Sequence, residues 1–399
     1  MGKYKVEDTV TAQRINDGQV VHVHLTNLEL FSSGAFSNVY RGRAEDLQSS
    51  SIKREVAIKK TWKLHRANEV TDIDAISEIR ILKLLNRLNH KNIVQLLYDF
   101  ANGYKERTCY GLVFEFLPET LHSYMKARRR QLELIDIKLF TWQLFRGQAH
   151  LTKACIMHRD IKPQNLLVEP VSGLLKISDF GSSAVMKREQ RQPPYHVTRY
   201  YRPPELLLEA KNYGTEVDVW SCGCVFGEML AGRTLLPGRN SEHQLDLIIE
   251  HFGIPTRDQA ASMHCPVRTY NKILDTAYHL TGSFPKLYRL IPDSQPKAAV
   301  QLLAKVLVYS PPERNCGLSF LLDPFFNDLF KSTTRRNHRP IECLSLQDLT
   351  DVRNGDGDVT AESLSDKRPP VPQKSGTIPS KSNESTTASL HTIQEITRK

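Results

Sequence analysis

Short apolar runs alternate with turn residues in the first part of the chain. Residues 20–25, 38–41 and 55–59 are rich in valine and other residues that favour strands. Two further runs, 93–96 and 112–114, have the same character. The pattern therefore predicts a small β-rich lobe.

One helix is predicted within this lobe, and helices dominate after Pro118. Isoleucine and leucine recur every three residues over 73–85, which is typical of a helix with one apolar face. The stretches 132–154, 217–230 and 298–308 read as longer or more deeply buried helices. A β-rich lobe followed by a helical lobe predicts an α+β fold.

Composition divides the chain into three parts. Residues 1–24 begin with a polar stretch without a clear period, so we expect an N-terminal extension. Residues 331–399 gather Ser, Thr, Lys and Pro with few aromatics, and we expect this tail to be disordered. Residues 25–330 are predicted to form one domain, with an N-lobe at about 25–117 and a C-lobe at about 118–330.

Bulk composition narrows the class of protein. Hydrophobic residues make up 40% and charged residues 25%, which is typical of a soluble globular chain. No apolar run has the length of a membrane helix, and the first residues lack the apolar core of a signal peptide. Seven scattered cysteines are best explained as reduced thiols. We therefore expect a cytoplasmic protein, and the basic run 126–130 leaves a nuclear signal open as the alternative to a solvated turn.

The net charge of +10 suits acidic or phosphorylated partners. Nucleic acid is the alternative, but the aromatic residues are not interleaved with the basic ones as a base-stacking surface requires. We therefore expect neither nucleic acid nor a membrane as a partner.

The strongest chemical signal is the sequence HRDIKPQN at 158–165. It matches a catalytic loop for phosphoryl transfer, in which Asp160 accepts the proton of the substrate hydroxyl and Asn165 holds Mg²⁺. Lys162 can contact the γ-phosphate, and Asp179 in the sequence Asp-Phe-Gly can chelate Mg²⁺ between the phosphates. Two such motifs in this order predict transfer of a phosphoryl group from Mg·ATP to a protein hydroxyl.

Other residues fit the same chemistry. Lys59 ends the run VAIK at 56–59, where its ammonium can hold the α- and β-phosphates, and Glu78 is the acid best placed to orient it. Glu205 could pair with Arg314, and Asp218 could accept backbone hydrogen bonds from the catalytic loop. For these last three we expect a structural role.

Four segments resemble the glycogen synthase kinase-3 (shaggy-type) family, a branch of the CMGC group of protein kinases. They are residues 117–120, 143–146, 158–167 and 198–202, and the sequence GIPTR at 253–257 is similar too. The resemblance covers roughly residues 25–330. It implies the bilobal protein-kinase fold, with one main helix in the N-lobe, and Ser/Thr kinase activity with ATP and Mg²⁺.

The resemblance also implies site residues. Phe114 would be the gatekeeper, with Glu115 and Leu117 offering backbone hydrogen bonds to the adenine. The full expected nucleotide site is Phe31, Ser32, Gly34, Ser37, Val39, Ala57, Lys59, Phe114, Glu115, Leu117, Gln164 and Leu167. Tyr195 would be the activation-segment tyrosine, and its phosphate would be bound by Arg199 and Arg202.

The departures from the family concern ATP and substrate. The glycine-rich loop keeps only Gly34, and the side chains of Ser32 and Ser37 should weaken ATP binding without abolishing it. Glu78 lies about one helical turn further from His90 than in the family, which a short insertion would explain.

The family's pocket for a priming phosphate has three basic residues. Arg159 matches one, but Ala184 and Ser77 replace the other two. A single arginine should hold phosphate poorly, so we expect priming to matter little unless Arg80 or Lys187 substitutes.

Partner binding is the last open point. The sequence HCPV at 264–267 replaces the usual polar residues before Tyr270, which argues against axin-like scaffolds. The run RPPVP at 368–372 could bind an SH3-type partner, although a plain linker is the simpler interpretation.

A pseudokinase that only binds partners is the alternative function. The altered glycine loop favours it, whereas intact Lys59, Asp160 and Asp179 oppose it.

Overall fold

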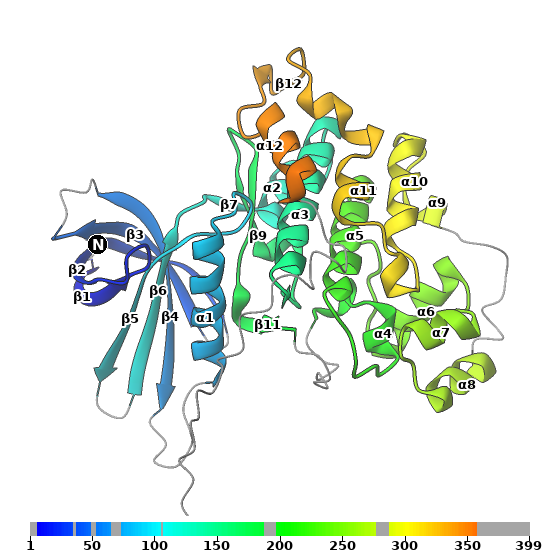
Figure 1. Cartoon of the computed structure of the whole chain (residues 1–399), viewed down its shortest axis with the longest axis horizontal. Helices are drawn as coiled ribbons and strands as arrows, with labels where there is room; N and C mark the ends of the chain where they lie inside the picture. The colour runs from blue at the N-terminus through cyan, green and yellow to red at the C-terminus, as the bar shows by residue number, and fades with distance from the viewer. Residues whose placement is uncertain are drawn as a thin grey trace, which may run out of the picture.

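The structure is a computed structural model that describes residues 6–34, 37–48, 53–64, 73–104, 107–186, 197–276 and 287–356. Figure 1 shows a β-rich lobe beside a larger helical lobe, which confirms the α+β prediction. None of the described helices is long and apolar enough to cross a bilayer.

The β-rich lobe is a closed six-stranded barrel with the strand order β1-β2-β3-β4-β6-β5. Alternation along β2 points Val21, Val23 and Leu25 inward, where they meet Val56 and Ile58 of β4 in a compact apolar core. The strands are β1 (Val6–Arg14), β2 (Val20–Ser33), β3 (Ser37–Asp46), β4 (Arg54–Leu64), β5 (Leu96–Tyr104) and β6 (Arg107–Glu115).

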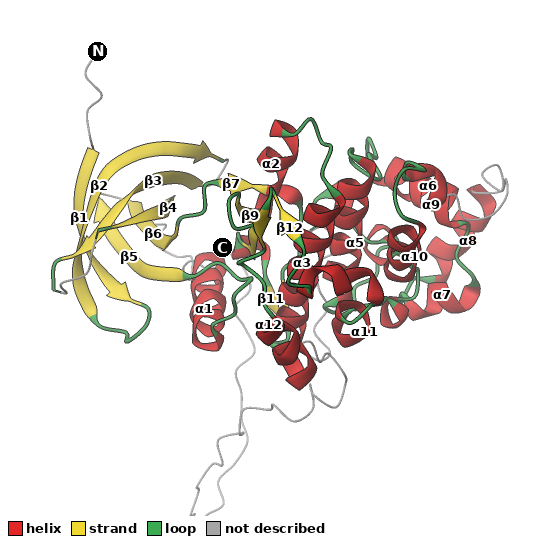
Figure 2. Ribbon diagram, turned by 90° about the horizontal axis from the view of Figure 1, so that it is seen from above, coloured by secondary structure: helices red, strands yellow, loops and turns green. Residues whose placement is uncertain are grey.

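The main helix of this lobe is α1 (Ile73–Leu88), as the periodicity predicts. Its residues Ile81, Leu82 and Leu85 belong to the apolar core of the helical lobe rather than to the barrel core. The helix therefore lies between the two lobes, and Figure 2 shows it in that place.

Helices α3 (Leu134–Lys153) and α5 (Glu216–Ala231) form the centre of the helical lobe and are buried along nearly their whole length. The other helices are α2 (Leu121–Ala127), α4 (Pro204–Leu207), α6 (Ser241–Phe252), α7 (Arg257–Ser262), α8 (Val267–Thr276), α9 (Leu287–Leu290), α10 (Lys297–Val306), α11 (Gly317–Leu321) and α12 (Leu346–Asp351). The short strands are β7 (Glu119–Thr120), β8 (Ile156–Met157), β9 (Leu166–Glu169), β10 (Leu174–Ile177), β11 (Ala184–Val185), β12 (Arg335–Arg336) and β13 (Arg339–Pro340).

The described residues of the predicted N-terminal extension, 6–24, are part of the barrel. Strand β1 pairs with both β2 and β5 and closes the barrel, and it contributes Val10 and Ala12 to the core. The inward face of β1 is short and one of its residues is small, so its hydrophobic pattern is weak.

The predicted disorder of the tail is wrong for residues 331–356. Arg336 is buried and pairs with Asp136 of α3 at 2.5 Å, and Cys343, Leu344 and Val352 join the main apolar core. A salt bridge to the helical lobe and a few buried apolar side chains thus hold this part of the tail in place. An average composition over the whole tail does not reveal such individual contacts. Residues 357–399, including 368–372, lie outside the described residues.

Two smaller expectations can be compared with the structure. Of the predicted strand at 93–96, only Leu96 lies in a strand, while Ile93 makes an isolated bridge to Ile177. All seven cysteines are free, and both Cys222 and Cys224 are buried.

Candidate active site

The catalytic loop lies between β8 and β9, and its aspartate has several partners. Asp160 accepts hydrogen bonds from Lys162 Nζ at 2.7 Å, Asn165 Nδ2 at 2.9 Å and Thr198 Oγ1 at 2.5 Å. The backbone N–H groups of His158 and Arg159 donate to Asp218 at 2.6 and 2.8 Å. Asp218 is fully buried, and its burial raises the pKa of its carboxyl group even though these donors oppose the shift. The loop is therefore held from two sides, with the Asp160 carboxylate fixed in place.

Lys59 joins the barrel to the helical lobe. Its ammonium donates to Glu78 Oε1 at 2.8 Å and to Asp179 Oδ1 at 3.0 Å. Burial alone would lower the pKa of Lys59, but the charges of Glu78 and Asp179 outweigh it and raise the pKa. Burial would conversely raise the pKa of Asp179, and the charge of Lys59 lowers it instead. Lys59 and Asp179 are thus both charged at neutral pH.

Strand alternation explains how β4 presents this lysine. Val56 and Ile58 point into the barrel core, so Ala57 and Lys59 lie on the opposite face of the strand. Ala57 is directly opposite Phe114 of β6, and Lys59 is directly opposite Val39 of β3. The register therefore places these four predicted nucleotide residues together on one face.

The hairpin between β2 and β3 corresponds to the predicted glycine-rich loop. Gly34 N donates to the Ser37 carbonyl at 2.9 Å, and Ser33 Oγ donates to Asn38 Oδ1 at 2.8 Å. Ser32 pairs with Val39 in the strand ladder. The hairpin is thus closed by local hydrogen bonds that involve serine and asparagine side chains.

Aromatic contacts flank this hairpin at the expected adenine site. Phe31 is half exposed, and its ring meets Phe116 edge to face at 6.0 Å. The guanidinium of Arg41 lies over the Phe116 ring at 4.7 Å and pairs with Glu55. Phe116, Arg41 and Glu55 were not among the predicted site residues, because their proximity to Phe31 depends on the tertiary structure.

The remaining nucleotide residues lie on the connection between the lobes and on β9. Glu115 donates its N–H to the Gln95 carbonyl at 3.1 Å, and its carboxylate accepts from Lys176 at 2.7 Å. Leu117 is buried, Leu167 is half-buried on β9, and Gln164 is exposed beside His122 at 3.4 Å.

Asn165 and Asp179 fit the requirements of a Mg²⁺ site. The Nδ2 of Asn165 donates to the carbonyl and the carboxylate of Asp160, so its Oδ1 is the amide atom left for a cation. The Asp179 carboxylate is half exposed and ionised, and oxygen ligands of this kind are those that Mg²⁺ prefers.

The predicted regulatory arginines make backbone contacts. Arg199 Nε donates to the Gly238 carbonyl at 2.8 Å, and Arg202 donates twice to the Val197 carbonyl at 3.1 and 2.9 Å. Tyr195 lies outside the described residues, so its pairing with these arginines stays a prediction.

At the position of the family's priming-phosphate pocket, Arg159 is buried and makes hydrogen bonds within the protein. Its Nε donates to the Ser182 carbonyl at 2.7 Å, and its side chain hydrogen-bonds Tyr213. Ala184 lies on β11, Ser77 is half-buried on α1, and Arg80 is exposed.

The predicted support for the activation segment is present. Arg314 makes a bidentate ion pair with Glu205 at 2.7 and 2.6 Å, and both side chains are almost fully buried. A residue that the sequence analysis did not single out is Thr198, which bonds Asp160 and also accepts from Lys162 at 3.2 Å. Thr198 lies in the segment 198–202, but nothing in that segment indicates that its hydroxyl reaches the catalytic loop.

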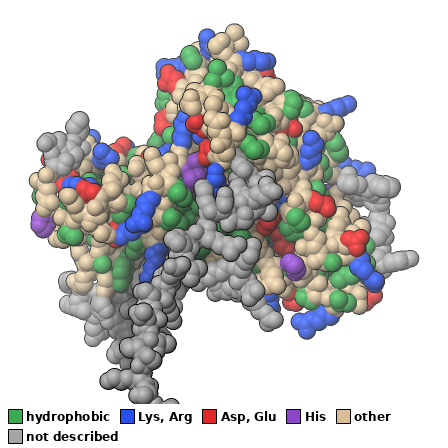
Figure 3. Space-filling view, in the orientation of Figure 1, with side chains coloured by type: hydrophobic (Ala, Val, Ile, Leu, Met, Phe, Trp, Pro, Cys, Tyr) green, Lys and Arg blue, Asp and Glu red, His purple; other side chains and the backbone are tan. Residues whose placement is uncertain are grey.

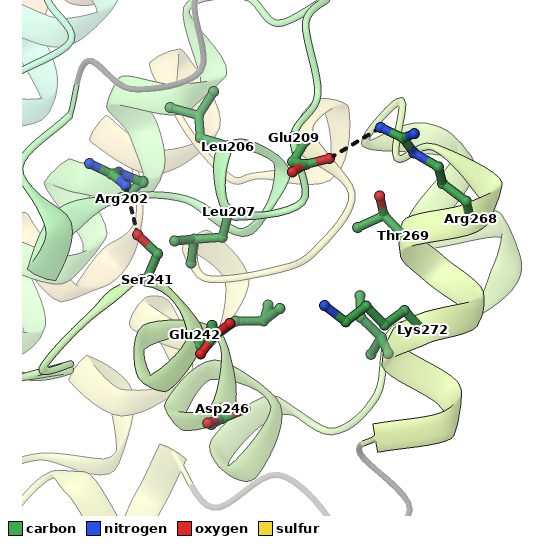
Figure 4. A pocket seen from close by; sticks show the side chains of 12 residues that line it. Arg202, Leu206, Leu207, Glu209, Ser241, Glu242, Asp246, Arg268, Thr269 and Lys272 are labelled. Carbon is green, nitrogen blue, oxygen red and sulfur yellow. Dashed lines mark hydrogen bonds and ion pairs between the residues drawn. The ribbon is translucent and has the colours of Figure 1, made fainter.

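A separate groove of about 920 Å³ lies between α4, α6 and α8 (Figure 4). Glu242 and Asp246 of α6 line it together with Arg268 and Lys272 of α8, and Leu206 is also part of its lining. Tyr270 of the predicted scaffold insert is buried, and its hydroxyl donates to the Pro255 carbonyl at 3.1 Å.

The comparisons with known proteins agree with this geometry. A family model described as a protein kinase domain matches residues 25–326. The chain is 32% identical over 340 residues to "Glycogen synthase kinase 1" of Pyricularia oryzae, covering 83% of this chain and 78% of the relative. It is also 32% identical over 354 residues to "Protein kinase gsk3" of Schizosaccharomyces pombe, covering 86% of this chain and 84% of the relative.

Proposed function

This chain belongs to the protein kinase family, in its glycogen synthase kinase-3-like branch, and we propose that Asp160 is the base of its phosphoryl transfer from ATP to serine or threonine. The observation that carries the proposal is the position of Lys59, which binds Glu78 of α1 and Asp179 of the helical lobe at once. This contact supports an assembled site, because the phosphate-binding lysine and the metal-binding aspartate lie side by side.

Each residue has a distinct role in this proposal. Asp160 orients the incoming hydroxyl and accepts its proton, and Lys162, bonded to Asp160, lies where it can neutralise the γ-phosphate. Lys59 holds the α- and β-phosphates, with Glu78 fixing its direction. Asn165 and Asp179 would hold Mg²⁺, which supplies charge neutralisation between the phosphates.

We further propose that substrate priming matters little. Arg159 donates to Ser182 and hydrogen-bonds Tyr213, so binding a phosphate would require these contacts to rearrange. The test compares a primed peptide with its unprimed twin, for the wild type and for Arg80→Ala. Similar rates with both peptides are expected. A large preference for the primed peptide that Arg80→Ala removes would contradict the proposal.

The alternative is a pseudokinase that binds partner proteins, and the β2–β3 hairpin is the observation that favours it. The two functions differ in one property, since a pseudokinase would bind nucleotide or partners without turning over ATP.

Scaffold binding itself stays a proposal, and the groove of Figure 4 suits an apolar helix poorly. Such a helix would have to desolvate Glu242 and Asp246, which is costly for charged groups.

Where the protein acts in the cell is likewise a proposal, based on composition alone. We expect the cytoplasm, with the nucleus as the alternative. Binding of an SH3-type partner through 368–372 would depend on a segment outside the described residues.

The decisive experiment is a phosphate-transfer assay with Mg·ATP and a Ser/Thr protein substrate. Asp160→Asn should reduce transfer by about 10²–10⁴-fold, because the amide cannot accept the hydroxyl proton. Asp17→Asn is the matched control, since Asp17 pairs with Arg14 on the barrel surface and should leave the rate unchanged. Equal rates for the wild type and Asp160→Asn would contradict the assignment of the base.

A further inference from the structure

The last described part of the C-terminal segment, residues 345–356, lies against the loop that follows α1. Asp348 of α12 is buried and accepts from Lys91 Nζ at 3.1 and 3.0 Å and from Arg146 Nη1 of α3 at 2.5 Å. Figure 2 shows α12 beside α3, and Figure 3 shows acidic, basic and histidine side chains gathered on the surface between the barrel lobe and α12. One carboxylate thus joins a helix of the large lobe to the loop at the end of α1.

A second carboxylate of the same segment repeats this arrangement. Asp356 lies 2.7 Å from Arg146 Nε and 3.5 Å from His90 Nε2. The His90 ring stacks on His150 of α3 with ring centres 4.3 Å apart, and Lys153 of α3 donates to the Gly355 carbonyl. Lys91 and His90 are neighbours in the loop, so both acidic residues act on the same few residues.

His90, His150 and Asp356 also have the composition of a metal site, but the hydrogen bonding argues against one. The backbone N–H of Asn92 donates to His90 Nδ1 at 3.1 Å, so in the neutral ring the proton must be on Nε2, the atom that faces Asp356. A protonated Nε2 has no lone pair for a metal ion, and Arg146 already neutralises the carboxylate. The cluster is therefore better explained as a contact that fixes the segment, in which Arg146 donates to Asp356 and His90 lies beside the same carboxylate.

The loop that receives these contacts also bonds to the strand that leads to Asp179. Ile177 N of β10 donates to the Asn92 carbonyl at 2.8 Å, and Val94 N donates to the Ile177 carbonyl at 2.9 Å. The Asn92 side chain donates to Gln143 of α3 at 3.1 Å. Residues 89–94 thus connect α1, which carries Glu78, to β10, which precedes Asp179.

We propose that Asp348 and Asp356 are positioning residues for phosphoryl transfer. They hold the loop at 89–92 against α3 and so fix the end of α1, which keeps Glu78 on Lys59. The proposal rests on the proposed kinase function. It assigns the C-terminal segment a part in the reaction, although none of its residues touches the nucleotide site.

Lys91→Met is the sharpest test, because the lysine side chain is 39% exposed and can be replaced without opening the core. Losing one partly exposed ion pair should lower kcat by about two- to fivefold and leave KM for the protein substrate unchanged. The matched control is Lys331→Met, which removes an ion pair with Asp328 elsewhere on the same segment and should leave kcat unchanged. Asp348→Asn, which weakens the contacts to both Lys91 and Arg146, should have a larger effect than Lys91→Met.

Glu78→Gln provides the readout that separates positioning from general stability. If Lys91 acts through Glu78, the double variant Lys91→Met/Glu78→Gln should be no slower than Glu78→Gln alone. Multiplicative losses in the double variant would overturn the proposal.

Amide hydrogen exchange across α1 gives a result that does not depend on activity. Exchange should be faster in Lys91→Met than in the wild type and unchanged in Lys331→Met. Faster exchange with no phosphoryl transfer by any variant would support the contact to α1 and contradict the kinase function. Unchanged exchange and unchanged kcat in Lys91→Met would contradict the positioning role while leaving the kinase function intact.

Discussion

The catalytic loop and the β2–β3 hairpin belong to the same proposed nucleotide site, yet they are supported in different ways. Asp160 has three side-chain donors, and buried Asp218 holds the backbone beside it. The described part of the hairpin is bonded within itself and paired with β4 through Ser37 and Asn38, and Phe31 next to it is half exposed. In the proposed site, the helical lobe would therefore present reacting groups that are bonded from several elements, while the barrel would cover the nucleotide with a segment supported by neighbouring strands.

We expect this difference in support to affect kcat and the KM for ATP separately. Groups that orient the hydroxyl and bind Mg²⁺ act on the transition state, so they should govern kcat. In the proposed site the hairpin would contact ATP before and during the reaction, so its altered residues should affect mainly the KM for ATP. We therefore expect the altered glycine loop to leave kcat nearly unchanged.

The largest expected effect concerns stability and compares one ion pair from each lobe. Arg314→Met would leave Glu205 buried without its partner, and the free energy of unfolding should fall by about 3–5 kcal/mol. Arg41→Met breaks the exposed pair with Glu55 in the barrel and should cost at most about 1 kcal/mol. Urea unfolding of both variants checks the difference, and equal losses would contradict the contrast between the lobes.

A smaller effect is expected when glycines are restored to the hairpin. The double variant Ser32→Gly/Ser37→Gly should lower KM for ATP by about three- to tenfold, because the backbone can then approach the phosphates more closely. Its kcat should stay within about twofold of the wild type. Initial rates over a range of ATP concentrations check both values; a raised kcat with unchanged KM would show that the hairpin limits the chemistry instead.

The smallest effect concerns the aromatic pair beside the hairpin. Phe31→Ala removes the edge-to-face contact with Phe116 and should raise KM for ATP by about two- to fivefold. Phe31→Leu keeps an apolar side chain and serves as the matched variant, with an intermediate KM. An unchanged KM in Phe31→Ala would mean that the ring does not contact the nucleotide.

The parts of the site that the sequence predicts are those with a fixed local pattern. Asp160, Asn165 and Lys162 lie within one short loop, and Lys59 follows a strand whose alternation can be read directly. The structure contains the predicted pairing of Glu78 with Lys59. This pairing could be predicted because the apolar period of α1 fixes which face of the helix turns inward. These predictions required little knowledge of how distant segments pack.

The parts that could not be predicted depend on contacts between distant segments. Strand β1 has a weak apolar pattern and gains its place by pairing with β2 and β5. Arg336 and Asp348 are buried in a polar segment because Asp136 and Arg146 on α3 neutralise them. Thr198 bonds Asp160 although 38 positions separate them in the sequence. Local composition carries no signal for such pairings.

The dependence of phosphoryl transfer on ATP concentration tests the central claim most directly. Purified wild-type protein with Mg²⁺ and a Ser/Thr substrate should show saturable transfer. The glycine-restoring variant should lower the KM for ATP, and Asp160→Asn should lower the rate at saturation by about 10²–10⁴-fold. Nucleotide binding without transfer at any ATP concentration would contradict the account and favour a partner-binding pseudokinase.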